Sequence, residues 1–150
     1  MKLAQVCETA VVTTPAAASL ADAAALMRRT HVGALVVVEE RRGAQWPVGI
    51  ITDRDIAVAV TRGGTPPPAA VGDVMTRSLV VAGEQDDFYE GLAKMRRFGV
   101  RRLPIVAADG RLRGIMTLDD VIDVLSAKLR EASSVVPRER RAEARQTPAR

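Results

Sequence analysis

The sequence is poor in the residues that build metal centres and stacking surfaces. Its 150 residues include one cysteine, Cys7, and one histidine, His31. A single cysteine excludes a disulfide framework within the chain, and this pair cannot supply a structural zinc site without carboxylates or a second subunit. Only two Phe, one Tyr and one Trp are present, whereas a groove that stacks single-stranded nucleic acid needs several aromatic faces. The composition therefore argues against a zinc protein and against a nucleic-acid platform.

Long apolar runs and a strongly one-sided charge are also missing. No stretch approaches the roughly 20 apolar residues of a membrane span. The net charge is +4, and residues 131–150 carry five Arg and three Glu, so residues 1–130 are close to neutral. The glycine fingerprint of dinucleotide-binding proteins, the P-loop, the zinc-protease motif and the nucleophile elbow do not occur. The sequence predicts a cytoplasmic protein that is not an enzyme and does not span a membrane.

The most informative feature that is present is an internal repeat. Residues 6–38 align with residues 74–106 at an offset of 68 positions, and the offset then becomes 65. The pattern Gly-Ile-x-Thr-x-x-Asp occurs in both copies, at 49–55 and at 114–120. Chance does not restore a register after one small insertion. We therefore interpret the sequence as a duplication.

Both copies predict the same order of elements, β-α-β-β-α. Capping boxes at 19–22 and 87–90 each precede an amphipathic helix, because a side-chain oxygen at the N-cap is followed three residues later by a carboxylate. A second helix is expected to begin at Thr52 in the first copy and at Thr117 in the second.

Between these helices each copy predicts two strands. The apolar runs 34–38 and 103–107 are typical of buried strands. In the second copy Asp109-Gly110 predicts a tight turn into a strand at 112–116. In the first copy, residues 39–47 predict a longer loop.

The repeats define the expected domain organisation. Residues 3–64 form the first repeat and residues 73–130 the second. Residues 65–72 contain three consecutive prolines and are expected to be a linker. Residues 131–150 are basic with little apolar periodicity, and they predict a disordered tail.

These motifs resemble those of a tandem pair of CBS domains, the Bateman module, over residues 3–128. The matching stretches are 14–23, 48–56, 74–76, 100–106 and 112–121. The resemblance implies a mixed α/β fold of the α+β kind, in which two β-α-β-β-α repeats pack with pseudo-two-fold symmetry. It also implies a stand-alone regulatory module that senses metabolic state by binding adenosine-containing ligands between the repeats, and that pairs as a homodimer.

The Thr-x-x-Asp pairs have two interpretations, and both stay open. Each pair can be a capping box that satisfies backbone N–H groups at a helix start. The same helix start also suits a phosphate, and a carboxylate suits the two hydroxyls of a ribose. The resemblance assigns these ligand contacts to Thr52, Asp55, Thr117 and Asp120.

The two copies differ between this threonine and this aspartate. Arg54 places a guanidinium beside the first helix start, so the cleft containing it is expected to prefer a longer phosphate chain. The second copy has Leu118 and Asp119 there. It also has Arg101 and Arg102 before its first buried strand, and the resemblance implies that one of them turns toward the cleft. Exposure to solvent is the alternative for each arginine.

Four valines complete the expected ligand contacts by walling the adenine: Val12, Val32, Val80 and Val100. No cofactor is required, and AMP, ADP, ATP or S-adenosylmethionine, with or without Mg²⁺, is the expected ligand. The expected partners are a second copy, bound through the four helices, and a regulated protein that the sequence does not identify.

Two other functions remain open. A ligand-free or metal-linked dimeric interaction or stress protein of the same fold would use Cys7 and His31. These residues stand where the other copy has Met75 and Gly99, which favours a packed thiol and a loop histidine. Contact with the ligand is a further alternative for His31. A nucleic-acid adaptor would use the arginines of the tail, for which solvated disorder is the default.

Overall fold

The computed structural model describes residues 1–61 and 70–135. Residues 62–69 and 136–150 lie outside this part; they include most of the linker predicted over 65–72 and most of the tail predicted over 131–150. The first half of the chain contains η1 (Leu3–Gln5), β1 (Thr13–Pro15), α1 (Leu20–Thr30), β2 (Ala34–Arg41), β3 (Ala44–Thr52) and α2 (Asp53–Thr61). The second half contains α3 (Val71–Val74), β4 (Ala82–Gly83), α4 (Phe88–Phe98), β5 (Arg102–Val106), β6 (Leu112–Thr117) and α5 (Leu118–Ser133).

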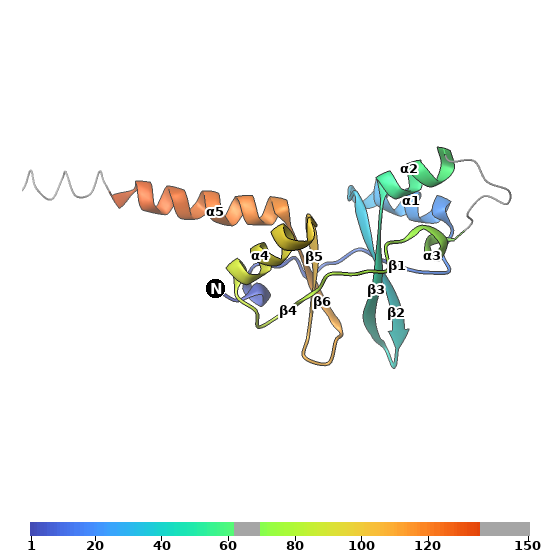
Figure 1. The fold of residues 1–150 in the computed structure, drawn as a ribbon, viewed down its shortest axis with the longest axis horizontal. Helices are drawn as coiled ribbons and strands as arrows, with labels where there is room; N and C mark the ends of the chain where they lie inside the picture. The colour runs from blue at the N-terminus through green and yellow to red at the C-terminus, as the bar shows by residue number, and fades with distance from the viewer. Residues whose placement is uncertain (62–69, 136–150) are drawn as a thin grey trace, which may run out of the picture.

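The strands form two separate three-stranded sheets with the same topology. Their orders are β1-β2-β3 and β4-β5-β6. In each sheet the first pair is parallel and the second is antiparallel. We call β1–β3 with α1 and α2 the first unit, and β4–β6 with α4 and α5 the second unit. The units lie side by side, and their hairpins point the same way, away from α2 and α5 (Figure 1). The α+β fold class predicted from the repeat is confirmed.

The helix starts follow from local capping. The Ser19 hydroxyl accepts a hydrogen bond from the backbone N–H of Asp22 at 3.0 Å and begins α1. At the start of α4, Asp87 accepts from the N–H of Tyr89, and its own N–H donates to Glu90. These contacts join residues within one turn, which is why the sequence pattern alone could predict them.

The ends of α1 and α4 share a left-handed residue. Gly99 ends α4 with φ 65°, and His31 ends α1 with φ 56°. Glycine adopts this conformation without steric cost, whereas a residue with a Cβ is strained in it. The duplication has therefore placed a histidine at a backbone position that favours glycine.

The hairpin of the first unit is tighter than predicted. The loop expected over 39–47 is wrong: β2 continues to Arg41, and β3 begins at Ala44. Arg42 and Gly43, with φ 51° and 75°, make the two-residue turn. The guanidinium of Arg41 also lies 5.6 Å from the ring centre of Trp46 across the hairpin, a cation–π contact that helps to hold the extended strands together.

The two units exchange their first helical turns. Leu3 of η1 is fully buried in the core of the second unit, against Phe88. Val71 of α3 is fully buried in the core of the first unit, with Leu35. The N–H of Val71 also donates to the carbonyl of Ala18 at 2.8 Å. Each core is therefore completed by residues from the other half of the chain.

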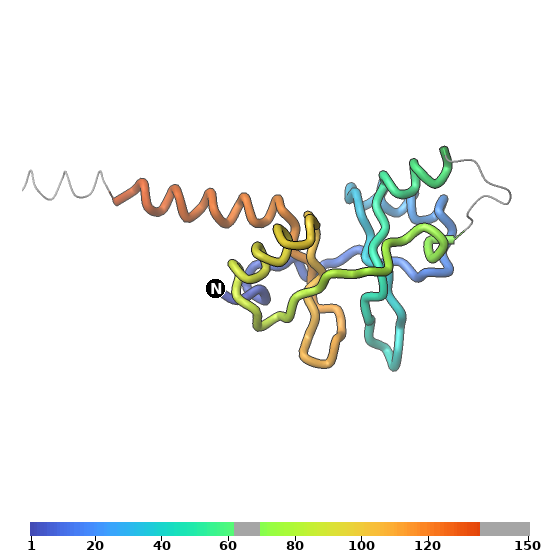
Figure 2. The backbone as a smooth tube through the Cα atoms, viewed as in Figure 1, coloured from blue at the N-terminus to red at the C-terminus, as the bar shows by residue number. Residues whose placement is uncertain are grey.

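The segments after these turns cross between the units, as the tube in Figure 2 shows. Residues 6–12 run from η1 to β1, and Glu8 pairs with Ile115 of β6. The equivalent segment of the second half brings Thr76 against Ile50 of β3. The two pairs are related by the sequence offsets of the repeat, so the pseudo-two-fold symmetry extends to the crossing segments.

This crossing explains the glycine of the Gly-Ile-x-Thr pattern. A Cβ on Gly114 would lie 2.6 Å from Sγ of Cys7 and 2.9 Å from the carbonyl oxygen of Glu8. A Cβ on Gly49 would meet Sδ of Met75 at 2.7 Å. The absence of a side chain at both positions lets the crossing segments pass directly over the sheets.

Candidate functional site

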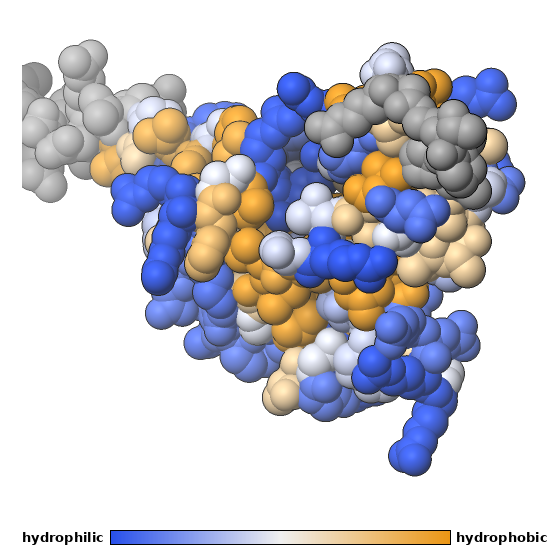
Figure 3. Space-filling model, turned by 45° about the vertical axis from the view of Figure 1, so that its right-hand side comes forward, coloured by the Kyte–Doolittle hydropathy of each residue, from blue (hydrophilic) through white to orange (hydrophobic). Residues whose placement is uncertain are grey.

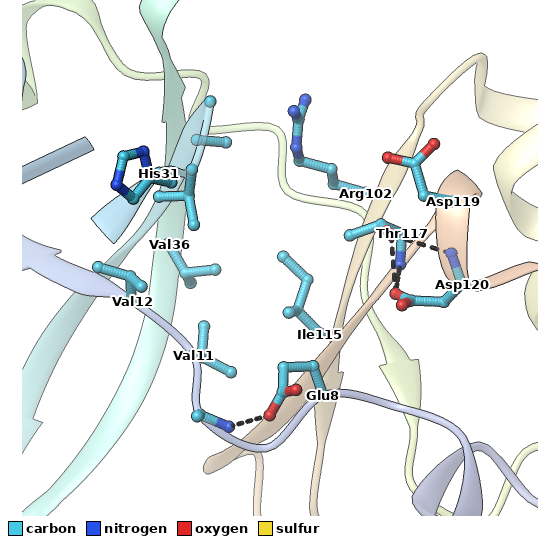
Figure 4. Close-up of a pocket in the computed structure, with 14 residues that line it drawn as sticks. Glu8, Val11, Val12, His31, Val36, Arg102, Ile115, Thr117, Asp119 and Asp120 are labelled. Atoms are coloured by element: carbon cyan, nitrogen blue, oxygen red, sulfur yellow. Dashed lines mark hydrogen bonds between the residues drawn. The ribbon is translucent and has the colours of Figure 1, made fainter. Parts of the chain in front are cut away.

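A cleft of about 320 Å³ lies between the two units and receives side chains from both. The crossing segment supplies Glu8, Val11 and Val12; the first unit supplies His31, Val32 and Val36; the second supplies Arg102, Ile115, Thr117, Asp119 and Asp120. Figure 4 shows the valines facing Ile115 across the cavity, with the polar groups of the second unit gathered at one end. The cleft is thus apolar on one side and charged on the other.

The charged end is built on the first turn of α5. Oδ2 of Asp120 accepts hydrogen bonds from the N–H and the hydroxyl of Thr117, both at 2.7 Å. The N–H of Asp120 donates in return to the Thr117 hydroxyl oxygen at 3.3 Å. Among the described residues, no hydrogen bond reaches Oδ1 of Asp120. The capping box therefore uses Oδ2 of the carboxylate and leaves Oδ1 without a hydrogen-bond donor in the described part of the chain.

The first turn of α2 repeats this geometry outside the cleft. Oδ2 of Asp55 accepts from the N–H of Thr52 at 2.9 Å and from its hydroxyl at 2.8 Å. Neither residue lines the 320 Å³ cavity, and Arg54 beside them is exposed. In both pairs the threonine proton is directed at its own aspartate. The hydroxyl therefore donates no hydrogen bond outward, so a phosphate at either site needs other donors.

The cleft brings together five of the eleven predicted ligand contacts, from both repeats: Val12, Val32, Arg102, Thr117 and Asp120. The other six do not line it: Thr52, Arg54, Asp55, Val80, Val100 and Arg101. Val80 and Val100 are half-buried against the core of the second unit. The Thr-Asp pair of one repeat thus faces the valines of the other repeat.

Arg101 lies beside the cleft rather than in it. It lines a smaller pocket of about 110 Å³, which shares Arg102, Thr117 and Asp119 with the cleft and adds Leu118. The two cavities therefore meet at the first turn of α5.

Arg102 reaches from the second unit toward the first. A Cβ on Gly33 would lie 3.4 Å from Nη2 of Arg102 and 3.4 Å from an oxygen of Asp53. The guanidinium therefore stands near the start of β2, and Figure 4 shows Arg102 between His31 of the first unit and Asp119 of the second. A Cβ at position 33 would be in van der Waals contact with this guanidinium.

Sequence reasoning did not assign Glu8, Ile115 or Asp119 to ligand contact, and it left ligand contact as an alternative for His31; all four line the cleft. Asp119 could have been found from its place between Thr117 and Asp120 on one helical turn. No sequence signal marks Glu8, because its position depends on the path of the crossing segment.

Cys7 and His31 lie in different parts of the molecule. Cys7 packs at the edge of the second core, and burial raises the pKa of its thiol. His31 is exposed at the end of α1. Within residues 1–61 and 70–135, no three His, Cys, Asp or Glu side chains are grouped to hold a metal ion. The described residues therefore provide no ligand set for the metal-linked alternative.

Comparison with known families identifies this architecture. A family model for the CBS domain matches residues 3–62 and 71–127. The chain belongs to the CBS domain family, and its two matches form a tandem pair. No helix of the described residues is long and apolar enough to cross a bilayer.

Curated relatives are about a third identical to this chain over the aligned residues. Protein MK0525 of Methanopyrus kandleri is 35% identical over 99 residues, a match that spans 65% of this chain and 49% of the relative. The CBS domain-containing protein YhcV of Bacillus subtilis is 36% identical over 103 residues, with 69% of this chain and 70% of YhcV covered. The chain thus spans about half of one relative and most of the other.

Solved structures of CBS pairs have the same fold. The CBS pair of protein MJ0100, in complex with 5′-methylthioadenosine and S-adenosylmethionine, has a TM-score of 0.75 at 24% identity, covering 85% of this chain and 98% of that one. CBSX2 of Arabidopsis thaliana in complex with AMP gives 0.73 at 24% identity, with 85% and 98% covered. The cytosolic domain of the Mg²⁺ channel MgtE in complex with ATP gives 0.69 at 24%, with 82% and 48% covered.

Proposed function

We propose that this chain is a regulatory module that binds an adenosine-containing ligand in the cleft between its two units. The observation that carries the proposal is the cleft itself, about 320 Å³, lined by aliphatic side chains and by Asp120, whose Oδ1 atom accepts no hydrogen bond from the described residues. This volume is within the range of small-molecule sites. An adenine ring fits between the valines and Ile115, and the ribose hydroxyls can donate to Asp120.

The fold-level neighbours support this choice of ligand. CBS pairs of the same architecture are described in complex with S-adenosylmethionine, 5′-methylthioadenosine, AMP and ATP. A ligand in this cleft touches both units and the crossing segment between them. It therefore favours the arrangement of the units that it fits best, and this is how binding would be transmitted to a regulated protein.

We assign a second ligand position to the first turn of α2, where Thr52, Arg54 and Asp55 repeat the geometry of α5. Val80, Val100 and Arg101 are its other proposed contacts, by the symmetry of the repeat. Arg54 is exposed and can form charge-assisted hydrogen bonds to a di- or triphosphate, with or without bound Mg²⁺. This position is therefore expected to prefer ATP to adenosine.

Exposed apolar side chains on the helices support self-association as a homodimer. Val60 of α2 is 71% exposed, Tyr89 of α4 is 63% exposed, and Ile122 and Leu129 of α5 are 53% and 72% exposed. Pairing of helix faces between two copies would remove them from water. Light scattering at tens of micromolar, a concentration above the dissociation constants of stable dimers, is expected to report a dimer. A monomer at that concentration contradicts the assembly.

The test of ligand binding is a calorimetric screen of AMP, ADP, ATP and S-adenosylmethionine, with and without Mg²⁺. At least one is expected to bind the parent protein. Asp120→Asn should weaken binding at the cleft, because it removes the carboxylate charge while keeping an oxygen that can cap α5. Asp55→Asn is the equivalent change at α2. Asp123→Asn, at an exposed position of α5 outside the cleft, is the matched control.

Thermal unfolding without ligand separates lost binding from a frayed helix. If none of the four compounds binds the folded parent, the ligand-free interaction protein of the same fold replaces this proposal.

A further inference from the structure

The cleft carries more negative than positive groups. Three carboxylates, from Glu8, Asp119 and Asp120, line it together with one guanidinium, from Arg102, and the imidazole of His31. None of the ion pairs among the described residues involves Asp119, Asp120 or Arg102. These carboxylates are therefore not neutralised by a direct protein partner within the described part of the chain.

Asp119 lies on the same turn of α5 that presents Asp120 to the cleft. It is the second residue of α5 and lies between Thr117 and Asp120 on the same turn. It lines both the cleft and the adjoining 110 Å³ pocket. Figure 4 shows Asp119 beside Arg102 and next to Thr117 and Asp120. The 5′ group of a ribose that contacts Asp120 would therefore extend close to Asp119.

The repeat supplies an internal comparison for this residue. At the offset of 65 positions, the counterpart of Asp119 is Arg54, and the counterpart of Leu118 is Asp53. The two equivalent helix starts therefore carry opposite charges at the same position. A polyphosphate that is attracted by Arg54 is repelled by Asp119.

We propose that the cleft at α5 selects adenosine compounds whose 5′ substituent is neutral or cationic, and that Asp119 is the residue that excludes free polyphosphates. The proposal rests on the adenosine-binding function proposed above and specifies the ligand class at one of its two positions. A sulfonium or thioether at the 5′ carbon meets no like charge at Asp119, whereas the phosphates of ATP do.

The single histidine of the chain gives an NMR probe at this cleft, and the response to Asp120→Asn separates ligand bound here from ligand bound near α2, where His31 also lines a pocket with Asp53. His31 lines the cleft, so its ring resonances report by NMR whether the cleft is occupied. The full chain is titrated without Mg²⁺ with 5′-methylthioadenosine, S-adenosylmethionine, AMP or ATP. The first two are expected to bind at least about tenfold more tightly than ATP, the size of one charge-assisted contact. Asp120→Asn should weaken the effect of every compound on these resonances.

Charge exchange at Asp119 is the decisive variant. Asp119→Arg reproduces the residue found at the equivalent position of α2 and should reverse the order, so that ATP binds more tightly than 5′-methylthioadenosine. Asp119→Asn should only narrow the difference, and Asp123→Asn on the exposed part of α5 should change nothing. Unfolding midpoints of the variants show whether α5 is intact.

Three results overturn the inference, and they can be told apart. If the His31 titrations give ATP the same dissociation constant as 5′-methylthioadenosine, Asp119 does not select the ligand. The same follows if Asp119→Arg leaves the ratio of the two dissociation constants unchanged. If calorimetry detects binding but His31 does not respond, the cleft at α5 is not the occupied position and the adenosine function stands. If no compound binds, both proposals fail.

Discussion

The exchange of first turns predicts that the start of the chain stabilises the second unit. Leu3 is 0% exposed and packs among the residues that form the second core, which include Phe88, Leu103 and Met116. Leu3→Ala removes most of a buried side chain and leaves a cavity, at a cost of about 2–5 kcal/mol. Because 1 kcal/mol shifts the Tm of a chain this size by roughly 2–4 °C, the Tm should fall by roughly 4–20 °C.

Amide hydrogen exchange locates this loss. The amides of β5 and β6 should lose more protection than those of β2 and β3, because Leu3 contacts the second core and not the first. Leu3→Met, which keeps the volume, should cost less than about 1.5 kcal/mol. An unchanged Tm for Leu3→Ala, or a loss of protection confined to β2 and β3, would refute the assignment of η1 to the second unit.

Three further changes test other features of the fold. Gly114→Ala should destabilise the protein by about 1–3 kcal/mol in urea unfolding, because its Cβ would overlap Cys7. An unchanged urea midpoint contradicts this and would mean that residues 6–12 shift to make room for the methyl group. His31→Gly should stabilise it by roughly 0.5–1 kcal/mol by relieving the left-handed backbone, and a lower midpoint contradicts this. The hydrogen bond from Lys94 at 2.9 Å and that from the backbone of Gly83 lower the pKa of Asp86. The ionised Asp86 carboxylate therefore stabilises the fold above its unfolded pKa of about 3.9, and this stabilisation is lost as the pH falls through the lower folded pKa. Asp86→Asn should be less stable than the parent at pH 7, and the difference should shrink below about pH 4. A difference that does not change with pH refutes the ion pair between Asp86 and Lys94.

Local patterns predicted the helix starts and the repeated topology. The hydrogen bonds at Ser19, Asp87 and Thr117 join residues within one turn, so the sequence contains both partners at a fixed spacing. The sequence predicts a loop over 39–47, whereas the structure has a two-residue turn in which Arg42 adopts a left-handed conformation that is rare for a residue with a side chain.

The sequence could not reveal which parts of the two repeats face each other. Leu3 and Val71 are single apolar residues in short turns and carry no periodic signal, so their exchange between the cores was not predicted. The same crossing decides which valines meet which Thr-Asp pair. The sequence therefore predicts site residues at equivalent positions of both repeats, whereas the cleft combines Val12 and Val32 of the first repeat with Thr117 of the second.

The exchanged turns also bear on how such a chain can arise. A chain with only one repeat would leave its core without the turn that η1 or α3 supplies here. Two such chains can complete each other by domain swapping, but this association depends on concentration and is lost on dilution. Joining them in one chain replaces the second molecule by a tethered copy at an effective concentration of roughly millimolar. The tandem arrangement thus keeps both cores complete at any protein concentration.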